Sequence, residues 1–300
     1  MDLDVLKSFL RIVELGSVSR AASELGISQP ALTRQMKRLE HALGSELLVR
    51  ESRGVQLTEA GEFLLPRIRP LLDQAEQVVE ELSEWRGALS GDVAICMPAS
   101  LHRSVTSPLV ADLRRTVPGL RLRVIDGFDA MLHDQLRDGL VDLGVLVHDP
   151  ERIIDGVDQA PLVREPLMLI GRVSAFPPDA QVKISDIADK DLALPGKRNY
   201  LRHRIETLFR KKGLAPRIGL EVDSMRLAND LVMGGECFSI VPQSGVEVVP
   251  RAGVAAWPIS GASVSWALCI QRRRRQSPVV RQVVARLTGY MLQPPRSKIG

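Results

Sequence analysis

Residues 29 to 38 carry polar side chains of the types that bind DNA, at helical spacing: Gln29, Thr33, Arg34, Lys37 and Arg38. Glutamine can form two hydrogen bonds with adenine, arginine two with guanine, and threonine can contact a base or a phosphate. Lys37 and Arg38 lie farther along the helix and suit phosphates better. A basic helix face is more often only solvated surface, so the surrounding elements must decide between the two interpretations.

The preceding residues predict how this helix is held. A second helix is expected over 18–25, and Gly26 suits the left-handed backbone of a tight turn. Ala21 and Ala22 are small enough to let two helices cross closely, and Ile27 can fill the space between them. This order predicts a helix-turn-helix whose last helix enters a major groove about 12 Å wide.

The predicted helices have clear boundaries. Ser17 and Ser28 can each cap a helix, Pro30 is tolerated in a first turn, and the third helix is expected to run to Leu43. The first helix ends at Gly16 and carries apolar residues at helical spacing: Leu3, Leu6, Phe9, Leu10 and Val13.

A short hairpin is predicted after these helices. Residues 47–50 and 55–57 favour β structure, and Glu51-Ser52-Arg53-Gly54 between them is typical of a turn. Such a wing can place Arg53 in a minor groove.

A long helix is predicted over 59–89, with Thr58 as its cap. Its near-heptad apolar stripe predicts a partner helix and therefore dimerisation. Packing on its own chain is the alternative, and Pro66 and Pro70 are expected to kink the helix. The stripe consists of Ala60, Leu64, Ile68, Leu71, Ala75, Val78, Leu82, Trp85 and Leu89.

Ser90-Gly91-Asp92 is expected to break this helix, and a different pattern follows. Short apolar runs such as 93–97, 120–125 and 143–147 alternate with helical stretches. The alternation predicts an α/β domain with a largely parallel sheet. We interpret Arg272–Arg275 as a solvated connection to a last helix that begins at Ser277.

Composition excludes several classes of protein. The chain has 300 residues, a net charge of +4 and 3 cysteines among apolar neighbours, which indicates reduced core residues and no metal site. No stretch of about 18 residues lacks charges, and the first residues lack the apolar core of a signal peptide, so we expect a cytoplasmic protein with no membrane contact. No catalytic motif or cofactor-binding loop is present, which argues against an enzyme.

The run SVSRAASELGISQPALTRQMKRLEHALGSELLVRESRGVQLTEAG closely resembles the signature of LysR-type transcriptional regulators. The match is dense over 3–61 and weaker over the rest. The resemblance implies an N-terminal winged helix-turn-helix, a long linker helix, and a C-terminal two-lobed α/β effector domain similar to type 2 periplasmic binding proteins. It also implies an inverted-repeat operator in double-stranded DNA, dimers of dimers, contact with RNA polymerase, and a small effector, often a carboxylate, between the lobes.

The resemblance also implies site residues. The positions that match DNA contacts are Gln29, Pro30, Thr33 and Arg34 on the recognition helix, with Arg50 and Arg53 at the wing. Lys37 joins the expected DNA-binding residues through its position on the helix, which suits a phosphate. Leu48 stands where phenylalanine is usual, which we expect to alter packing only.

The implied effector site draws on both lobes: Ser100, Leu101, Phe128, Pro195, Arg202 and Cys237. Ser100 can bind the effector or only cap a helix. Phe128 favours a more apolar or aromatic effector, and Arg202 can pair with a carboxylate or lie on the surface. Cys237 replaces a usual glycine and can narrow the cleft.

The implied domains are 1–58 for DNA binding, 59–89 for the linker and 91–300 for the effector. Lobe one comprises 91–161 and 266–300, and lobe two comprises 162–265. Peroxide-sensing relatives carry a reactive cysteine in the stretch that matches 195–209, and this chain has none there. A C-terminal domain that serves assembly alone is the remaining alternative.

Overall fold

The computed structural model describes residues 2–51, 54–87, 89–246 and 253–293. They fall into two units, Met1–Val79 and Glu80–Gly300, and each is described by itself. Within the described ranges, no helix combines the length and the apolar character needed to cross a membrane.

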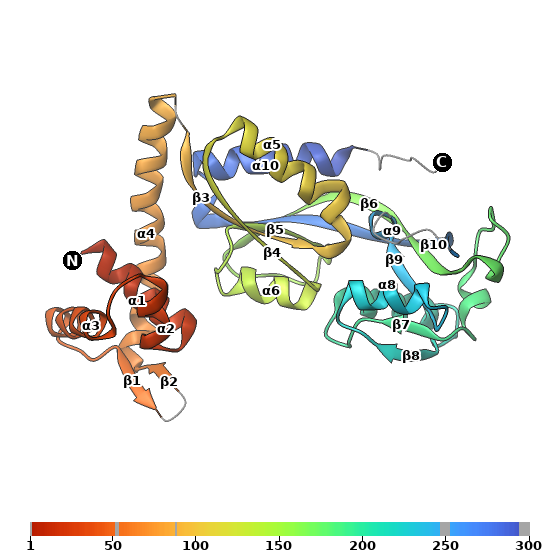
Figure 1. Ribbon diagram of the computed structural model, residues 1–300, viewed down its shortest axis with the longest axis horizontal. Coiled ribbons are helices and arrows are strands. Elements are labelled where there is room, and N and C mark those ends of the chain that lie inside the picture. The colour runs from red at the N-terminus through yellow and green to blue at the C-terminus, as the bar shows by residue number, and fades with distance from the viewer. Residues whose placement is uncertain (1, 52–53, 88, 247–252, 294–300) are drawn as a thin grey trace. The chain divides into compact units, whose positions relative to one another are not determined.

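The first unit begins with α1 (Leu3–Leu15), α2 (Val18–Glu24) and α3 (Gln29–Leu43) (Figure 1). The hydroxyl of Ser17 accepts a hydrogen bond from the Arg20 amide, and that of Ser28 accepts one from the Ala31 amide. Both predicted caps are therefore confirmed. Each satisfies one backbone amide that its helix leaves free.

The turn between α2 and α3 depends on Gly26, whose φ of +68° is left-handed. Ala21 and Ala22 are buried beside it, as their small size predicts. They share a core with residues from all three helices and the wing: Leu6, Phe9, Ile12, Leu32, Met36, Leu39 and Leu47.

The wing consists of antiparallel strands β1 (Leu48–Glu51) and β2 (Gly54–Leu57). The amide of Val55 donates a hydrogen bond to the Gly16 carbonyl over 3.0 Å. A Cβ on Gly54 would lie only 2.5 Å from that oxygen, so the close approach requires glycine. The wing is thereby attached to the end of α1.

Helix α4 (Glu59–Trp85) is shorter than predicted. Thr58 caps it by accepting a hydrogen bond from the Gly61 amide, and Pro66 and Pro70 lie inside it. Left-handed Gly87 follows its end, and Ser90, expected to break the helix, instead starts a strand. The backbone there pairs in register with residues 119–121, a tertiary contact that local sequence does not reveal.

The second unit contains one eight-stranded sheet in the order β4-β3-β5-β10-β6-β9-β7-β8. The prediction of a largely parallel sheet is wrong, because two parallel blocks are joined by antiparallel pairings of β10 and β6. The strands are β3 (Ser90–Pro98), β4 (Gly119–Gly127), β5 (Leu143–Val147), β6 (Val157–Arg172), β7 (Leu192–Leu194), β8 (Ile218–Glu221), β9 (Phe238–Pro242) and β10 (Val254–Gln271).

Helices cover both faces of the parallel block formed by β3, β4 and β5 (Figure 1), and the core clusters place helices on both faces of the other block. Along β3, Ile95 and Met97 belong to the core cluster that contains α5 and α10, whereas Cys96 packs with residues of α6. Along β7, Leu192 and Ala193 likewise face opposite clusters. The helices are α5 (Ser107–Thr116), α6 (Asp129–Arg137), α7 (Tyr200–Arg210), α8 (Met225–Met233), α9 (Gln243–Val246) and α10 (Pro278–Leu292).

The two long strands connect the blocks. Residues 167–170 of β6 pair with β9, while residues 266–270 of β10 pair with β5. The lobe boundaries near 162 and 266 stay a prediction.

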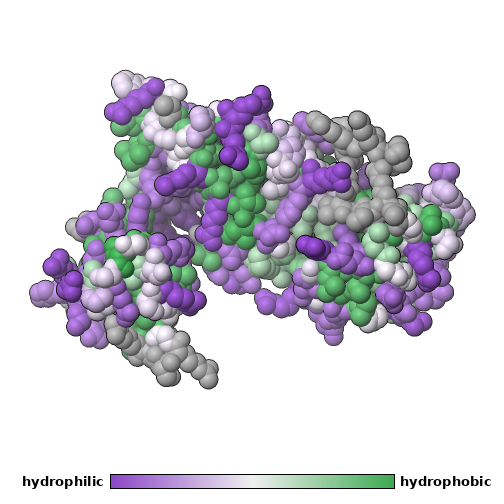
Figure 2. Space-filling view, in the orientation of Figure 1, coloured by the Kyte–Doolittle hydropathy of each residue, from purple (hydrophilic) through white to green (hydrophobic). Residues whose placement is uncertain are grey.

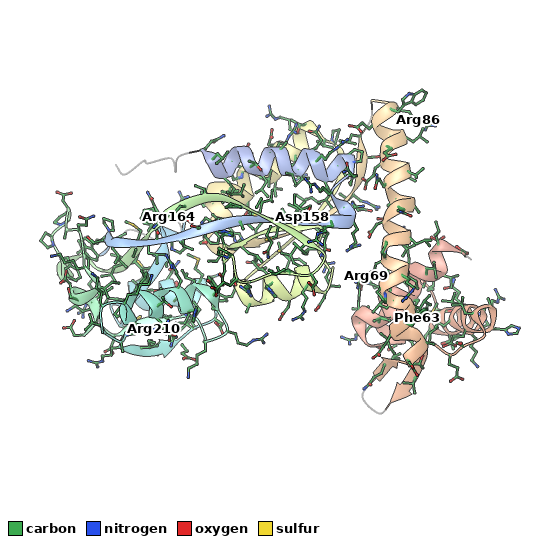
Figure 3. The ribbon with its side chains drawn as sticks, turned by 180° about the vertical axis from the view of Figure 1, so that it is seen from behind. Phe63, Arg69, Arg86, Asp158, Arg164 and Arg210 are labelled. Atoms are coloured by element: carbon green, nitrogen blue, oxygen red, sulfur yellow. The ribbon has the colours of Figure 1, made fainter. Side chains whose placement is uncertain are left out.

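The arginine run after β10 is only partly solvated, contrary to our interpretation. Arg272 and Arg275 pair with Asp158, whose position Figure 3 labels. Arg274 is 2% exposed. Its buried positive charge is compensated by two carboxylates, because its guanidinium nitrogens lie 3.2 Å from Glu80 and 3.0 Å from Asp142. A buried ion pair therefore joins the last turns of α4 to the sheet.

Candidate nucleic-acid interface and effector cleft

Helix α3 has one buried face and one exposed polar face. Leu32, Met36 and Leu39 are buried, whereas Gln29 and Arg34 are exposed. The same amphipathic pattern that fixes the helix in its core therefore leaves its polar side chains accessible to a groove.

The predicted base-reading residues lie together at the start of α3. Gln29 and Thr33 are one helical turn apart, and so are Pro30 and Arg34. Thr33 is half-buried, and Lys37 is exposed on the following turn. This arrangement offers hydrogen-bond donors and acceptors near the N-terminus of the helix and positive charge farther along.

The backbone of Arg50 pairs with Val55 in the hairpin. Arg53 lies outside the described residues.

A cleft of about 1200 Å³ lies between the two parallel blocks of the second unit. One wall consists of residues 99, 102, 126–128, 130–131 and 134, which follow β3, form the end of β4 and its connection to α6, or belong to α6. The other consists of residues 196–199, 221, 223–226 and 229–230, which precede α7, end β8, connect β8 to α8, or belong to α8. The cleft thus lies at the carboxyl ends of parallel strands, where α/β sheets commonly bind ligands.

Charged side chains meet across this cleft. A guanidinium nitrogen of Arg198 lies 3.3 Å from the carboxylate of Asp134 on α6. The carboxylate of Asp223 accepts a hydrogen bond from the Gly196 amide over 2.9 Å, which fixes the loop before α7. The hydroxyl of Ser224 accepts one from the Leu227 amide and caps α8.

Of the predicted effector residues, Phe128 lines the cleft. Ser100 and Leu101 are buried in the short helical turn after β3, whereas their neighbours Ala99 and His102 line the cleft. The predicted turn therefore lies at the cleft, but the side chains of Ser100 and Leu101 are buried in the protein and do not line the cleft.

Arg202 and Pro195 are joined to each other and lie outside the cleft lining. The guanidinium of Arg202, 3% exposed, donates to the Pro195 carbonyl over 2.9 Å and pairs with Glu206 over 2.7 Å. Arg202 therefore fixes the turn before α7, and this turn carries Lys197 and Arg198 at the cleft.

Cys237 is buried beside Ile170 and Ala193 and also lies outside the lining. Burial raises the pKa of its thiol. The Cys237 side chain therefore packs in the core beside β9 and does not narrow the cleft.

Sequence reasoning missed most of the charged lining. Arg198 stands within the stretch singled out before α7, but Asp134 and Arg226 lie on helices whose facing side depends on how the blocks pack. Over the part of the chain that the structure describes, no group of three histidine, cysteine or carboxylate side chains is arranged to hold a metal.

Comparisons with known proteins agree with this architecture. Residues 3–62 match the model for the bacterial regulatory helix-turn-helix protein of the lysR family, and residues 86–291 match the LysR substrate binding domain. The chain is 30% identical over 304 residues to the nitrogen assimilation regulatory protein nac of Escherichia coli, covering 99% of this chain and 98% of that protein. It is 29% identical to the HTH-type transcriptional regulator BenM of Acinetobacter baylyi, over 81% of each.

Solved structures extend the similarity to three dimensions. Full-length CbnR complexed with its target DNA has a TM-score of 0.56 and 26% identity, with 97% of this chain and 100% of that chain covered. Full-length BenM has the same TM-score and identity, with 97% and 95% covered. The chain therefore belongs to the LysR family of transcriptional regulators, which bind DNA and are not enzymes.

Proposed function

We propose that α3 reads an inverted-repeat operator through Gln29, Pro30, Thr33 and Arg34. The observation that carries this proposal is the exposed row at the start of α3, backed by a buried apolar face. Lys37 contacts phosphate, and Arg50 and Arg53 act from the wing. Helix N-termini in a major groove contact base edges, and phosphate contacts set the register.

Dimerisation through α4 follows from its exposed apolar side chains. Val78 is 66% exposed, Leu82 47% and Trp85 82%, at the spacing of a coiled-coil seam. Phe63, labelled in Figure 3, is 62% exposed on the same helix. A two-fold dimer would present two copies of α3 to two half-sites, and a dimer of dimers would cover a longer operator.

The cleft of the second unit takes a small effector that controls promoter activation by RNA polymerase in the cytoplasm. Its lobes are 91–161 with 266–300, and 162–265. Phe128 favours an effector with an apolar or aromatic part, and Lys197 and Arg226 supply positive charge for a carboxylate. An effector acts only through a difference in affinity between two arrangements of the protein.

A genome-wide binding survey followed by footprinting tests the proposal. We expect discrete sites with inverted symmetry and half-sites separated by about one or more helical turns of DNA. The Gln29→Ala protein should lose preference at one base position of each half-site. Uniform occupancy without a shared motif would contradict the proposed reading by α3.

A further inference from the structure

The cleft of the second unit contains two buried polar atoms that lack partners among the described residues. Asn229, on α8, is 4% exposed, and its Oδ1 receives no hydrogen bond. His102, on the opposite wall, has a buried Nε2 atom that makes no hydrogen bond and lies 3.8 Å from a carboxylate oxygen of Asp126. Both residues line the cleft.

An unpaired buried acceptor is costly, so a native protein normally supplies a donor for it. Asn229 Oδ1 can only accept a hydrogen bond. His102 Nε2 can also accept when the ring proton is on Nδ1. A ligand that satisfies both atoms must therefore carry N–H or O–H donors.

The charge of the cleft selects among such donors. Its described lining holds more carboxylates than permanent cations: Asp126, Asp134, Glu221, Asp223 and Asp230 against Lys197, Arg198 and Arg226. The Arg198–Asp134 pair and the Glu221 contact with Arg202 over 3.7 Å neutralise part of this set. Among the described residues, no lysine or arginine forms an ion pair with Asp126 on one wall or with Asp230 on the other. A positively charged donor would be attracted by these carboxylates and could also donate a hydrogen bond to Asn229 Oδ1.

We infer that the effector carries an ammonium group on an apolar body, with the ammonium at Asn229 and between the carboxylates. Phe128, Met131 and Met225 supply apolar surface for that body, and Met131 is 43% exposed. This inference rests on the proposed effector role of the cleft and names the chemistry of the ligand. An effector that also carries a carboxylate, which would pair with Lys197 or Arg226, is an amino acid. An effector without a carboxylate is a simple amine.

Exposed apolar side chains also occur outside the cleft lining, next to lining residues in the sequence. Figure 2 shows hydrophilic residues over most of the visible face, with hydrophobic patches between them, one over the region of α8 and β8. Leu227 on α8 is 50% exposed and Leu220 on β8 is 39% exposed.

Calorimetric titration of the full chain with matched sets of compounds tests this inference. Each set contains an amino acid, its decarboxylated amine and its deaminated carboxylate, for example phenylalanine, phenethylamine and 3-phenylpropanoate, with equivalent sets built on leucine and methionine. We expect the tightest compound to carry the ammonium. Amino acid and amine are distinguished by whether removal of the carboxylate weakens binding.

Two variants locate the ammonium. Asn229→Leu removes the acceptor, and Asp126→Asn removes an exposed charge without disturbing a core. Each should weaken binding roughly 10-fold to 100-fold, as expected for a lost hydrogen bond to a charged group. Asp155→Asn, the same charge change on an exposed residue outside the cleft lining, should leave affinity unchanged.

The inference is overturned if the carboxylate lacking the ammonium binds best, if no compound binds, or if neither variant weakens binding. Operator affinity of the same proteins without ligand is measured in parallel. Retained operator binding then separates a wrong ligand class from a failure of the regulator function itself.

Discussion

At the scale of single residues, burial separates side chains that can contact a partner from side chains that hold neighbouring segments in place. Arg34 and Arg202 are both arginines near a helix start. Arg34 is exposed, whereas Arg202 is buried against the Pro195 carbonyl and Glu206. Their types alone do not separate these roles, because the difference is made by burial.

The cysteines permit a residue-scale prediction about redox chemistry. Burial raises the pKa of all three thiols, to about 12 for Cys269. Because a thiolate is the reactive form, the folded protein should react slowly with thiol reagents at pH 7, and only above the raised pKa values would thiolates accumulate. Peroxide should leave operator affinity unchanged in the wild type and in Cys237→Ser. A peroxide response that disappears in Cys237→Ser would contradict this account.

The site was predictable from sequence to different extents. The polar face of α3 could be predicted because helical spacing is local. For the cleft, the sequence indicated only two of the loops that line it, the one at Phe128 and the stretch 195–202. Asn229 could not be recognised, because its side chain becomes a cleft acceptor only when the two blocks of the sheet face each other.

At the scale of elements, helix starts were the most predictable feature. Ser17, Ser28 and Thr58 cap the helices they precede, because capping depends on neighbouring amides only. The end of α4 and the antiparallel pairing of β10 and β6 were not predictable in this way. Both depend on strands that are distant in sequence.

The buried pair of Glu80 and Arg274 should stabilise the end of α4 strongly. Arg274→Met removes the guanidinium that pairs with the buried Glu80 carboxylate, so we expect a loss of about 3–5 kcal/mol in the free energy of unfolding. The control is Arg281→Met, which breaks a pair with Glu84 between side chains 56% and 46% exposed. That loss should be about 0–1 kcal/mol. Denaturant unfolding measures both, and equal losses would show that the buried pair has no special role.

The exposed stripe on α4 makes a second prediction at this scale. Val78→Asp places a charge on the proposed seam and should shift the protein toward monomers, since a buried unpaired charge is costly. Val173, 54% exposed on another element, supplies the control Val173→Asp. Analytical ultracentrifugation over a range of concentrations measures the change. An unchanged dimer in Val78→Asp would mean that α4 does not form the seam.

At the scale of the whole molecule, the chain combines a helix-turn-helix unit with a substrate-binding domain that contains a cleft. Binding at the cleft can change operator affinity only if it favours one of two arrangements of the protein, and the DNA must then change ligand affinity by the same factor. Measuring ligand affinity with and without operator DNA would give this coupling directly.

Whether α3 reads DNA sequence can be measured through the operator affinity of Arg34→Ala across a range of salt concentrations. The control is Arg210→Ala, which removes an exposed arginine of α7 (Figure 3). We expect Arg34→Ala to weaken specific binding by about 1–3 kcal/mol, roughly 5-fold to 150-fold, and to relax preference at one base position, while Arg210→Ala binds like the wild type. Equal affinity of Arg34→Ala and wild type for operator and random DNA alike would show that α3 does not read DNA sequence.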